Sequence, residues 1–373
     1  MLVPVLGNQR PYGTLLRVLL LVSIALIVLG VAYVVVNPGS TSPVDAKRTE
    51  PPVSVIVWTP VSLGRGRATM ASGKAGLWVA QQSPSGRRGK LLQIDASVST
   101  KKTSGRPIKT YRIPLAPLSL AVGAKALWVV GETGRAGYAT LLRVDPATGH
   151  IVHMVHLAAP SSCSTAPFAS CYPVATRRGV WVPLLNGLEH VNAAGTMADE
   201  NVDLKGRVWA LTTDGRWLWV LAETAIDRVN PRNGAWTSRT NLRPSTGSGM
   251  QANHVSADGK TVWISSYPRS SEALSSMITQ VPVDGGKVQQ SRIYPGAGPL
   301  VLIDGGLWLS RYNGQGEIDR LDATTGRLTG PFVVVPDQPV ALVQRADTLW
   351  VLGYRLNGNV RTLTRVTLGP AKT

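Results

Sequence analysis

One tripeptide, an aliphatic residue followed by Trp and a second aliphatic residue, recurs seven times and constrains the fold more than any other feature. Its tryptophans are Trp78, Trp128, Trp181, Trp219, Trp263, Trp308 and Trp350. Their spacings are 50, 53, 38, 44, 45 and 42 residues. Units of about 45 residues are typical of β-propeller blades, each of which holds about four strands. We expect these tryptophans to pack between neighbouring blades as core residues.

Each repeat has the same internal order. In the second, an apolar stretch at 117–122 precedes a Gly turn, the Trp strand, a polar loop, a third strand at 141–145 and a fourth strand. A turn such as Pro146–Gly149 joins the last two strands. In such a turn an Asp or Asn side chain accepts a hydrogen bond from the backbone, and Gly takes a positive φ. We therefore interpret Asp145, Asn230 and Asp322 as turn residues. The pattern predicts an all-β, seven-bladed propeller of four-stranded blades.

The last repeat lacks a fourth strand. After its third strand at 361–367 only Leu-Gly-Pro-Ala-Lys-Thr remains. Residues 53–58, VSVIVW, are rich in β-branched residues and precede the first repeat. We expect 53–58 to be the outer strand of the last blade, which closes the ring and leaves no free edge at the seam. The propeller then spans 53–373.

The N-terminal region has an uncharged run at 18–36, nineteen residues that are mostly apolar. That length suits one transmembrane helix. Arg10 and Arg17 precede the run and no acid lies before Asp45, so 1–17 is expected to be a cytoplasmic tail and the propeller extracytoplasmic at a bacterial cell membrane. Residues 37–52 read as a linker. The alternative is a cleaved signal peptide with an apolar core at 18–29.

The charge is strongly positive: 39 Lys and Arg against 21 Asp and Glu give +18. One group lies in the first repeat and includes Arg87 and Arg88; its further members are Lys90, Lys101, Lys102, Arg106, Lys109 and Arg112. A second group follows the Trp strands: Arg135, Tyr267, Arg269, Arg311, Tyr312, Tyr354 and Arg355. Propeller topology brings the loops after second strands to one face.

Guanidinium forks bind carboxylate and phosphate, and Tyr adds a flat apolar surface. We therefore expect Arg87, Arg88 and the second group to bind an anionic partner: an acidic envelope polymer, lipid headgroups or an acidic protein. No nucleic-acid partner is expected in that compartment. The alternative is a generally basic surface without a specific partner.

Two cysteines, Cys163 and Cys171, lie within a long insertion at 158–172 between the second and third repeats. Outside the cytoplasm they are expected to form a disulfide, and the alternative is two free thiols. The disulfide-closed loop is expected either to form a binding surface or to be a tolerated insertion without a function.

The five histidines do not suggest a metal site. His150, His153 and His156 are three residues apart, and such positions on a strand point to opposite faces. We expect an exposed edge strand there. His190 is expected to pack within a third strand, and His254 to lie on a first strand near the central channel. No Gly-rich phosphate loop is present, and no cofactor is expected.

The repeat resembles those of bacterial seven-bladed propellers of the streptogramin B lyase type, and also those of quinoprotein dehydrogenases, over residues 53–373. A lyase-like site would use His254 with Glu132 or Glu223. Both glutamates follow Trp strands, in LWVVGE and LWVLAE, one residue later than the family spacing, and no Glu-x-His pair exists. The quinoprotein Trp after the turn has one near match, Trp236, without an adjacent Cys pair.

Three functional hypotheses follow. The first is a membrane-anchored extracytoplasmic binding or interaction module, favoured because the basic rim has no coherent catalytic set beside it. The second is a streptogramin B lyase-like enzyme. The third is a structural subunit of an envelope complex.

Overall fold

The computed structural model describes residues 53–96, 107–123, 125–133, 138–161, 172–204, 206–222, 225–242, 250–268, 275–303, 306–312, 315–329, 332–346, 348–355 and 360–371. These ranges are built from β-strands and contain no helix. Accordingly, they include no helical segment with the length and apolarity needed to cross a bilayer. The predicted segments 1–17, 18–36 and 37–52 lie outside the described residues.

The strands form seven antiparallel sheets, the blades. Blade 1 holds β3 (Ala68–Gly73), β4 (Gly76–Gln82), β5 (Gly89–Ile94) and β6 (Pro107–Ile113). Blade 2 holds β7 (Ala116–Gly123), β8 (Ala126–Glu132), β9 (Thr140–Val144) and β10 (Ile151–His156). Blade 3 holds β11 (Val174–Ala175), β12 (Gly179–Leu184), β13 (Gly187–Asn192) and β14 (Ala198–Asp203). Blade 4 holds β15 (Val208–Thr213), β16 (Leu218–Ala222), β17 (Ala225–Val229) and β18 (Trp236–Asn241).

The remaining blades repeat this order. Blade 5 holds β19 (Met250–Ala257), β20 (Thr261–Pro268), β21 (Ser275–Pro282) and β22 (Gln289–Pro295). Blade 6 holds β23 (Ala297–Ile303), β24 (Gly306–Tyr312), β25 (Gly316–Asp322) and β26 (Val333–Val335). Blade 7 contains β27 (Gln338–Arg345), β28 (Thr348–Arg355) and β29 (Val360–Ala371).

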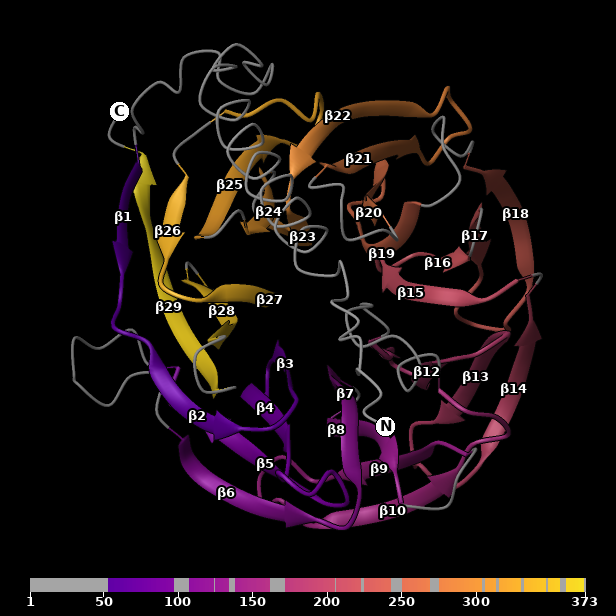
Figure 1. Cartoon of the computed structure of the whole chain (residues 1–373). Coiled ribbons are helices and arrows are strands. Elements are labelled where there is room, and N and C mark those ends of the chain that lie inside the picture. The colour runs from indigo at the N-terminus through magenta and orange to yellow at the C-terminus, as the bar shows by residue number, and fades with distance from the viewer. Residues whose placement is uncertain are drawn as a thin grey trace, which may run out of the picture. The chain divides into compact units, whose positions relative to one another are not determined.

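The blades are arranged in a ring in chain order. First strands of successive blades contact one another, as β3 contacts β7 and β23 contacts β27, and β27 also contacts β3. The first strand of each blade therefore faces the centre and the fourth lies outside, as Figure 1 shows for β6, β10 and β18. The predicted all-β, seven-bladed fold with four strands per blade is confirmed.

The outer side of β29 pairs with two segments from the other end of the chain. β1 (Val53–Val57) runs antiparallel to it, with Ile56 opposite Thr367. β2 (Val61–Arg65) continues along the same edge, with Val61 opposite Leu363. Between the two strands, the backbone N–H of Trp58 donates to the Arg365 carbonyl at 2.9 Å. The sequence predicted neither β2, which contains Gly64 at φ 90°, nor the extension of β29 to Ala371.

The seven repeat tryptophans form the core, as predicted. None is more than 3% exposed. Six of them pack in clusters that join two blades; Trp128 of blade 2, for example, lies in one cluster with Val180 and Val182 of blade 3. Burying an indole removes about 150–250 Å² from water, so these boundaries carry much of the stability.

A second repeated feature was not expected from the sequence. On the third strand of each blade, the residue paired with the tryptophan is polar and ends in a planar group. These residues are Gln93, Arg143, His190, Arg228, Gln280, Arg320 and Arg365. The guanidinium carbon of Arg143 lies 5.9 Å from the centre of the Trp128 ring, and Arg320 repeats this over Trp308 at 5.8 Å. Arg228 lies 6.0 Å from the Trp219 ring centre, whereas Arg365 lies over Trp58 at 4.7 Å. All four arginines therefore have a structural contact with an indole.

Polar side chains of one blade also bond to the turn that precedes the fourth strand of the next. The Nε of Arg143 donates to the Ala193 carbonyl at 3.0 Å, and the Nε2 of Gln280 donates to the Thr324 carbonyl at 2.9 Å. The indole of Trp181 donates to the Pro231 carbonyl at 3.3 Å. Blades are thus joined by polar bonds as well as by apolar packing.

The turn residues have the structural role that the sequence predicted. The Asp145 carboxylate accepts from the Ala147 N–H at 2.8 Å, and Asp322 accepts from the N–H groups of Thr324 and Thr325. Because these bonds favour the charged form, the pKa of each carboxyl lies below its usual value. Gly149 closes the Asp145 turn at φ 72°.

Candidate functional site

The two faces of the ring carry different loops. The loops from second to third strands and the links between blades lie on one face, called the link face. The hairpins from first to second strands and the turns from third to fourth strands lie on the other, called the hairpin face. This assignment follows from the up-and-down strand order of every blade.

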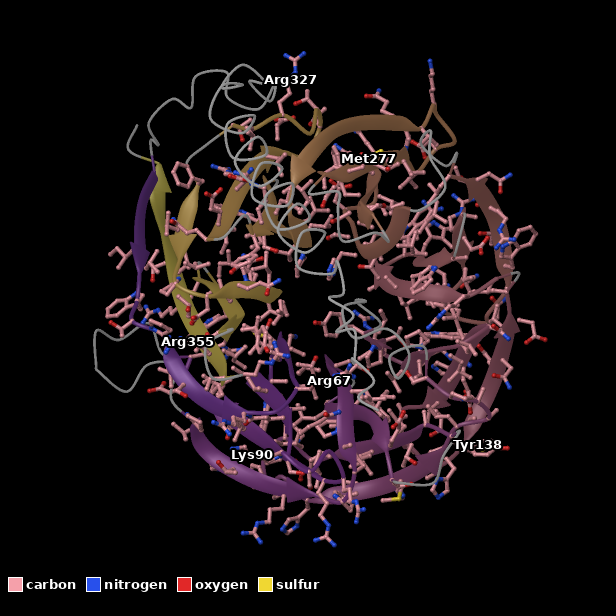
Figure 2. All side chains as sticks on the ribbon, viewed as in Figure 1. Arg67, Lys90, Tyr138, Met277, Arg327 and Arg355 are labelled. Carbon is pink, nitrogen blue, oxygen red and sulfur yellow. The ribbon has the colours of Figure 1, made fainter. Side chains whose placement is uncertain are left out.

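The basic group of blade 1 gathers on β5, β6 and the loop before them. Arg87 and Arg88 are exposed on the β4–β5 loop, at the link face. Lys90 of β5 lies directly opposite Arg112 of β6, and Figure 2 labels Lys90 near the outside of the ring. Like charges in directly opposed positions destabilise a sheet. The repulsion within this pair destabilises the fold, and a bound anion would relieve it. The pair therefore marks a surface suited to an anion. Lys101, Lys102 and Arg106 lie outside the described residues.

Arg311 is not on the rim, where the sequence placed it. The strand β24 extends three residues beyond its Trp tripeptide, so Arg311 is still within the sheet and only 4% exposed. Its guanidinium contacts Glu317 at 2.7 Å and also pairs with Asp319. A buried guanidinium held by two carboxylates is an internal ion cluster, while the next residue, Tyr312, is partly exposed.

Arg355 is 46% exposed and is engaged by its own blade. Its Nε and Nη2 donate to the two oxygens of Asp337, at 2.9 and 3.3 Å, and this pairing raises its pKa. Asp337 also accepts from the Thr362 hydroxyl at 2.7 Å. Arg355 therefore fastens the link before β27, with part of its guanidinium still open to solvent.

The adjacent Tyr354 is covered by another arginine. The guanidinium carbon of Arg361 lies 4.4 Å from the Tyr354 ring centre. Burial lowers the pKa of Arg361, and the charge of nearby Arg67 adds to that effect. Arg67 is exposed, and Figure 2 labels it together with Arg355. The link face between blades 7 and 1 thus gathers several cations, of which the sequence had indicated only Arg355, because Arg67 and Arg361 do not follow a Trp strand.

His254 and Glu132 lie on two blades that are not neighbours in the ring. His254 lies on β19, the first strand of blade 5, and Glu132 ends β8 of blade 2. His254 is 6% exposed, and burial lowers its pKa to about 3. Its imidazole is therefore neutral at physiological pH. The lyase-like set stays a prediction, and Glu223 lies outside the described residues.

Several other predicted residues also fall outside the part that the structure describes. These are Arg135, Arg269, Cys163 and Cys171. Tyr267 lies on β20, and its side chain is outside the described set. The anion-site and disulfide predictions at these positions stay predictions.

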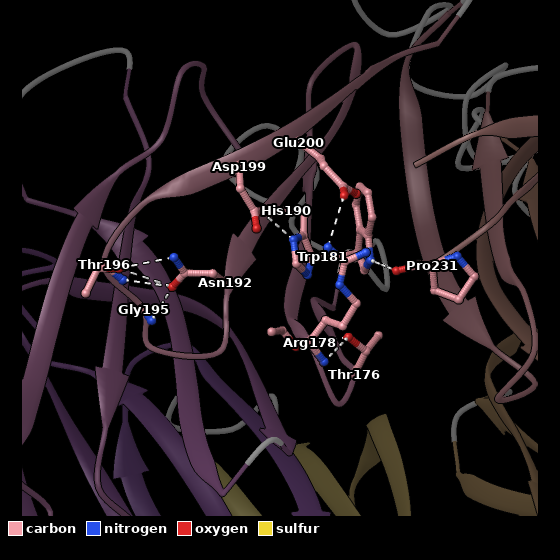
Figure 3. A network of polar contacts seen from close by, with 11 residues as sticks. Thr176, Arg178, Trp181, His190, Asn192, Gly195, Thr196, Asp199, Glu200 and Pro231 are labelled. Atoms are coloured by element: carbon pink, nitrogen blue, oxygen red, sulfur yellow. Dashed lines mark hydrogen bonds and ion pairs between the residues drawn. The ribbon is translucent and has the colours of Figure 1, made fainter. Parts of the chain in front are cut away.

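His190 belongs to a polar network in blade 3, shown in Figure 3. Its Nδ1 lies 2.5 Å from the Asp199 carboxylate, and its ring is tilted against Trp181 with centroids 4.7 Å apart. His190 is buried, as expected of a residue packed on a third strand. His153, by contrast, is exposed on the outer strand β10, which confirms the expected edge strand.

Two further titratable groups, the buried Glu189 and the partly buried Tyr172, were missed by sequence reasoning. The Glu189 carboxylate accepts from the Ala158 N–H at 2.9 Å, and burial raises its pKa. Tyr172, just before β11, packs against the core cluster of blades 1 and 7, which includes Met70, and burial raises the pKa of its phenol. Both side chains tie the links around blade 3 to the rest of the ring. Within the described ranges, no three His, Cys, Asp or Glu side chains gather closely enough to hold a metal ion.

The chain is similar in fold to several solved propellers. BamB from Moraxella catarrhalis superposes with a TM-score of 0.53 at 10% identity, covering 84% of this chain and 100% of that one. The Neurospora crassa Pan2 WD40 domain gives 0.57 at 8% identity, covering 87% and 98%. BBS1N, solved in complex with ARL6DN, gives 0.57 at 11% identity, covering 87% and 99%.

No protein-family model and no curated protein sequence matches the chain. At such low identities the similarity establishes the fold alone. A propeller fold is consistent with a binding or interaction module in general.

Proposed function

We propose that this protein is a membrane-anchored, extracytoplasmic binding module that holds an anionic partner on the link face and outer edge of blade 1. The observation that carries the proposal is the direct opposition of Lys90 and Arg112. Two like charges at paired positions repel each other, and a bound carboxylate or phosphate between them converts that repulsion into attraction on both sides.

The neighbouring charges support the same surface. Arg87 and Arg88 are exposed on the β4–β5 loop just before β5, and Lys109 is exposed on β6. An acidic protein segment suits a surface on an edge strand, because β6 is the outer strand of its sheet. An acidic envelope polymer offers the same carboxylate or phosphate chemistry, and the probes below separate the two sources.

The anchoring is part of the proposal. Residues 18–36 cross the membrane, 1–17 are cytoplasmic and 37–52 link the helix to the propeller. Residues 53–58 close the ring on the outside of β29. Alkaline carbonate extraction tests the anchor, since a chain with a retained helix stays with the membrane. N-terminal sequencing of the mature protein distinguishes a retained anchor from a cleaved signal peptide.

Binding is tested with the full chain in detergent, using polyglutamate and inorganic polyphosphate as separate probes. The variant R88Q/K90Q/R112Q should weaken binding to at least one probe about tenfold or more at low salt. The control R232Q/K287Q/R327Q removes the same formal charge from turns on the hairpin face and should leave binding within about twofold. Equal weakening by both variants would show that only the net charge matters and would overturn the proposal.

A further inference from the structure

The first-to-second-strand hairpins carry a cation in every blade whose hairpin side chains the structure describes. The residues are Lys74, Lys125, Arg177, Arg178, Arg216 and Lys260. In blade 7, Arg345 ends β27 beside the corresponding hairpin, and the hairpin of blade 6 falls at 304–305, outside the described residues. Because first and second strands are the innermost of each blade, these hairpins surround the central axis at the hairpin face. We call this set the hairpin ring.

Most of the hairpin ring is turned to solvent. Lys74, Lys125, Arg177 and Lys260 are exposed. Arg178 lies 3.5 Å from Glu200, and Arg345 donates to the Gly73 carbonyl. The ring is therefore a set of cations whose charge is largely available to a ligand on this face.

The two acids described in these hairpins are occupied locally. The Asp214 carboxylate accepts from the N–H groups of Arg216 and Trp217 and from the Trp219 indole. The Asp258 carboxylate accepts from the N–H groups of Lys260 and Thr261. Both acids serve to close their turns, so they do not reach out to neutralise the lysines and arginines of other blades.

The backbone at Lys125 shows that the turn itself does not favour a lysine there. Lys125 has φ 59°, a left-handed conformation that is unfavourable for residues with a Cβ. Turns in other blades place glycine in this region of φ, at Gly215 and Gly259. In blade 7 the uncharged Ala346 adopts φ 51° at the corresponding hairpin, so the conformation belongs to these hairpins and the hairpin ring is defined by its exposed charges alone.

The path of β1 shows which face the preceding chain enters. β29 follows the second-to-third loop of blade 7, so it runs from the link face to the hairpin face. β1 is antiparallel to it, with Ile56 opposite Thr367 and Val57 opposite Val366. β1 therefore begins at the hairpin face. The 16 residues of 37–52 have a root-mean-square reach of only about 20–24 Å as a flexible chain.

We infer that the hairpin ring lies on the anionic headgroups of the membrane in which residues 18–36 are anchored. This rests on the anchoring stated under Proposed function. The chain enters the propeller at this same face through β1, and lysine and arginine charges attract phosphatidylglycerol-type lipids within about a Debye length, roughly 8 Å at physiological salt. The link face, with Arg87 and Arg88, then points away from the membrane toward a partner.

The test is hydrogen–deuterium exchange of the full chain in nanodiscs. One disc type contains phosphatidylcholine alone, and the other contains about one third phosphatidylglycerol. Amides at 73–76, 123–126 and 258–261 should exchange several-fold more slowly in the anionic discs, and high salt should remove the difference. The variant K74Q/K125Q/K260Q should lose it, whereas R88Q/K90Q/R112Q on the opposite side should keep it. Equal exchange of the wild-type hairpins in both discs would overturn the inference.

Failure of the anchor is measured separately. If carbonate releases the chain from native membranes, the anchoring is wrong, and the released full chain is then sedimented with vesicles of the same two compositions. Binding of the wild type to the anionic vesicles, with loss in K74Q/K125Q/K260Q, supports the hairpin ring even so. Absence of binding refutes the ring as well.

Discussion

The Nε of Arg143 in blade 2 donates to the backbone carbonyl of Ala193 in blade 3 across 3.0 Å. The same guanidinium lies over the Trp128 indole of its own blade, 5.9 Å from the ring centre. One side chain thus joins the repeated core residue to the turn of the next blade. The turn of blade 3 approaches so closely that a Cβ on its Gly195 would lie 2.5 Å from the Arg143 Cδ.

We expect Gly149→Ala to destabilise the protein far more than Gly86→Ala. Both glycines have nearly the same backbone conformation, φ 72° and φ 70°, so both substitutions incur the left-handed penalty of about 1–2 kcal/mol. Only at Gly149 does a new Cβ meet neighbouring atoms, the Tyr111 ring of blade 1 at 2.2 Å, while nothing lies near Gly86. Urea denaturation of both variants measures the difference. Equal losses would contradict close packing of this turn on blade 1.

Arg311→Ala should cost about 3–5 kcal/mol of unfolding free energy, because it leaves Glu317 and Asp319 buried without that cation. Arg88→Ala, at an exposed position, should stay within about 0.5 kcal/mol. Urea denaturation of both variants measures the two losses, and an Arg311→Ala loss as small as that of Arg88→Ala would show that the ion cluster contributes little.

His254 should make stability fall in acid. Its folded pKa is about 3, against an unfolded value near 6.5. Between those values the unfolded chain binds the extra proton, so unfolding becomes easier by up to about 1.4 kcal/mol for each pH unit lost. His254→Gln should flatten the slope of unfolding free energy against pH in that window, and His153→Gln at the exposed edge should not. Identical slopes in wild type and His254→Gln would refute this.

Deletion of 53–58 should lower the stability of the whole ring. It removes the ladder bonds to β29 and the Trp58 indole bond to the Thr367 hydroxyl at 3.2 Å, each worth about 1 kcal/mol. Calorimetry should show a lower melting temperature in one shared transition. A deletion of equal length at 41–46, in the linker, is the control. An unchanged melting temperature would mean that the outer segment does not hold the seam.

Lys125→Gly should stabilise the propeller by about 1 kcal/mol, because glycine adopts φ 59° without strain. In the same variant, the amides of this hairpin should be less protected from hydrogen–deuterium exchange on anionic nanodiscs, since one cation of the hairpin ring is removed. Lys125→Gln is the comparison that removes the charge and keeps the strain. A Lys125→Gly protein that is no more stable than Lys125→Gln would argue against strain at this turn.

The sequence repeat predicted the blades because each repeat must bury its tryptophan. Trp128 and its counterparts must lie between sheets, and the strands around them follow from that requirement. The outer segment of blade 7 was harder to predict, since Gly64 within β2 does not look like a strand residue. The third-strand partners of the tryptophans were also missed, because a cross-strand register is not visible along a single chain.

The candidate site was less predictable than the fold. The sequence assigned Arg311 to a loop because the Trp tripeptide does not show where its strand ends, and β24 in fact continues to Tyr312. The opposition of Lys90 and Arg112 depends on the register of β5 and β6. The register that makes β1 begin at the hairpin face comes from its antiparallel pairing with β29.

The bonds from blades 2, 3 and 5 to the turn of the next blade also bear on how the protein unfolds. A linear array of repeats has two ends, and such arrays fray from them. Here β27 contacts β3, so the nearest-neighbour couplings close on themselves and every blade has two neighbours. Opening the ring anywhere must break one such boundary. The chain also bridges all seven boundaries between consecutive strands, because β2 of blade 7 leads directly into β3 of blade 1. Blade 7 is nevertheless the one blade assembled from both ends of the polypeptide. Partial unfolding should therefore begin there.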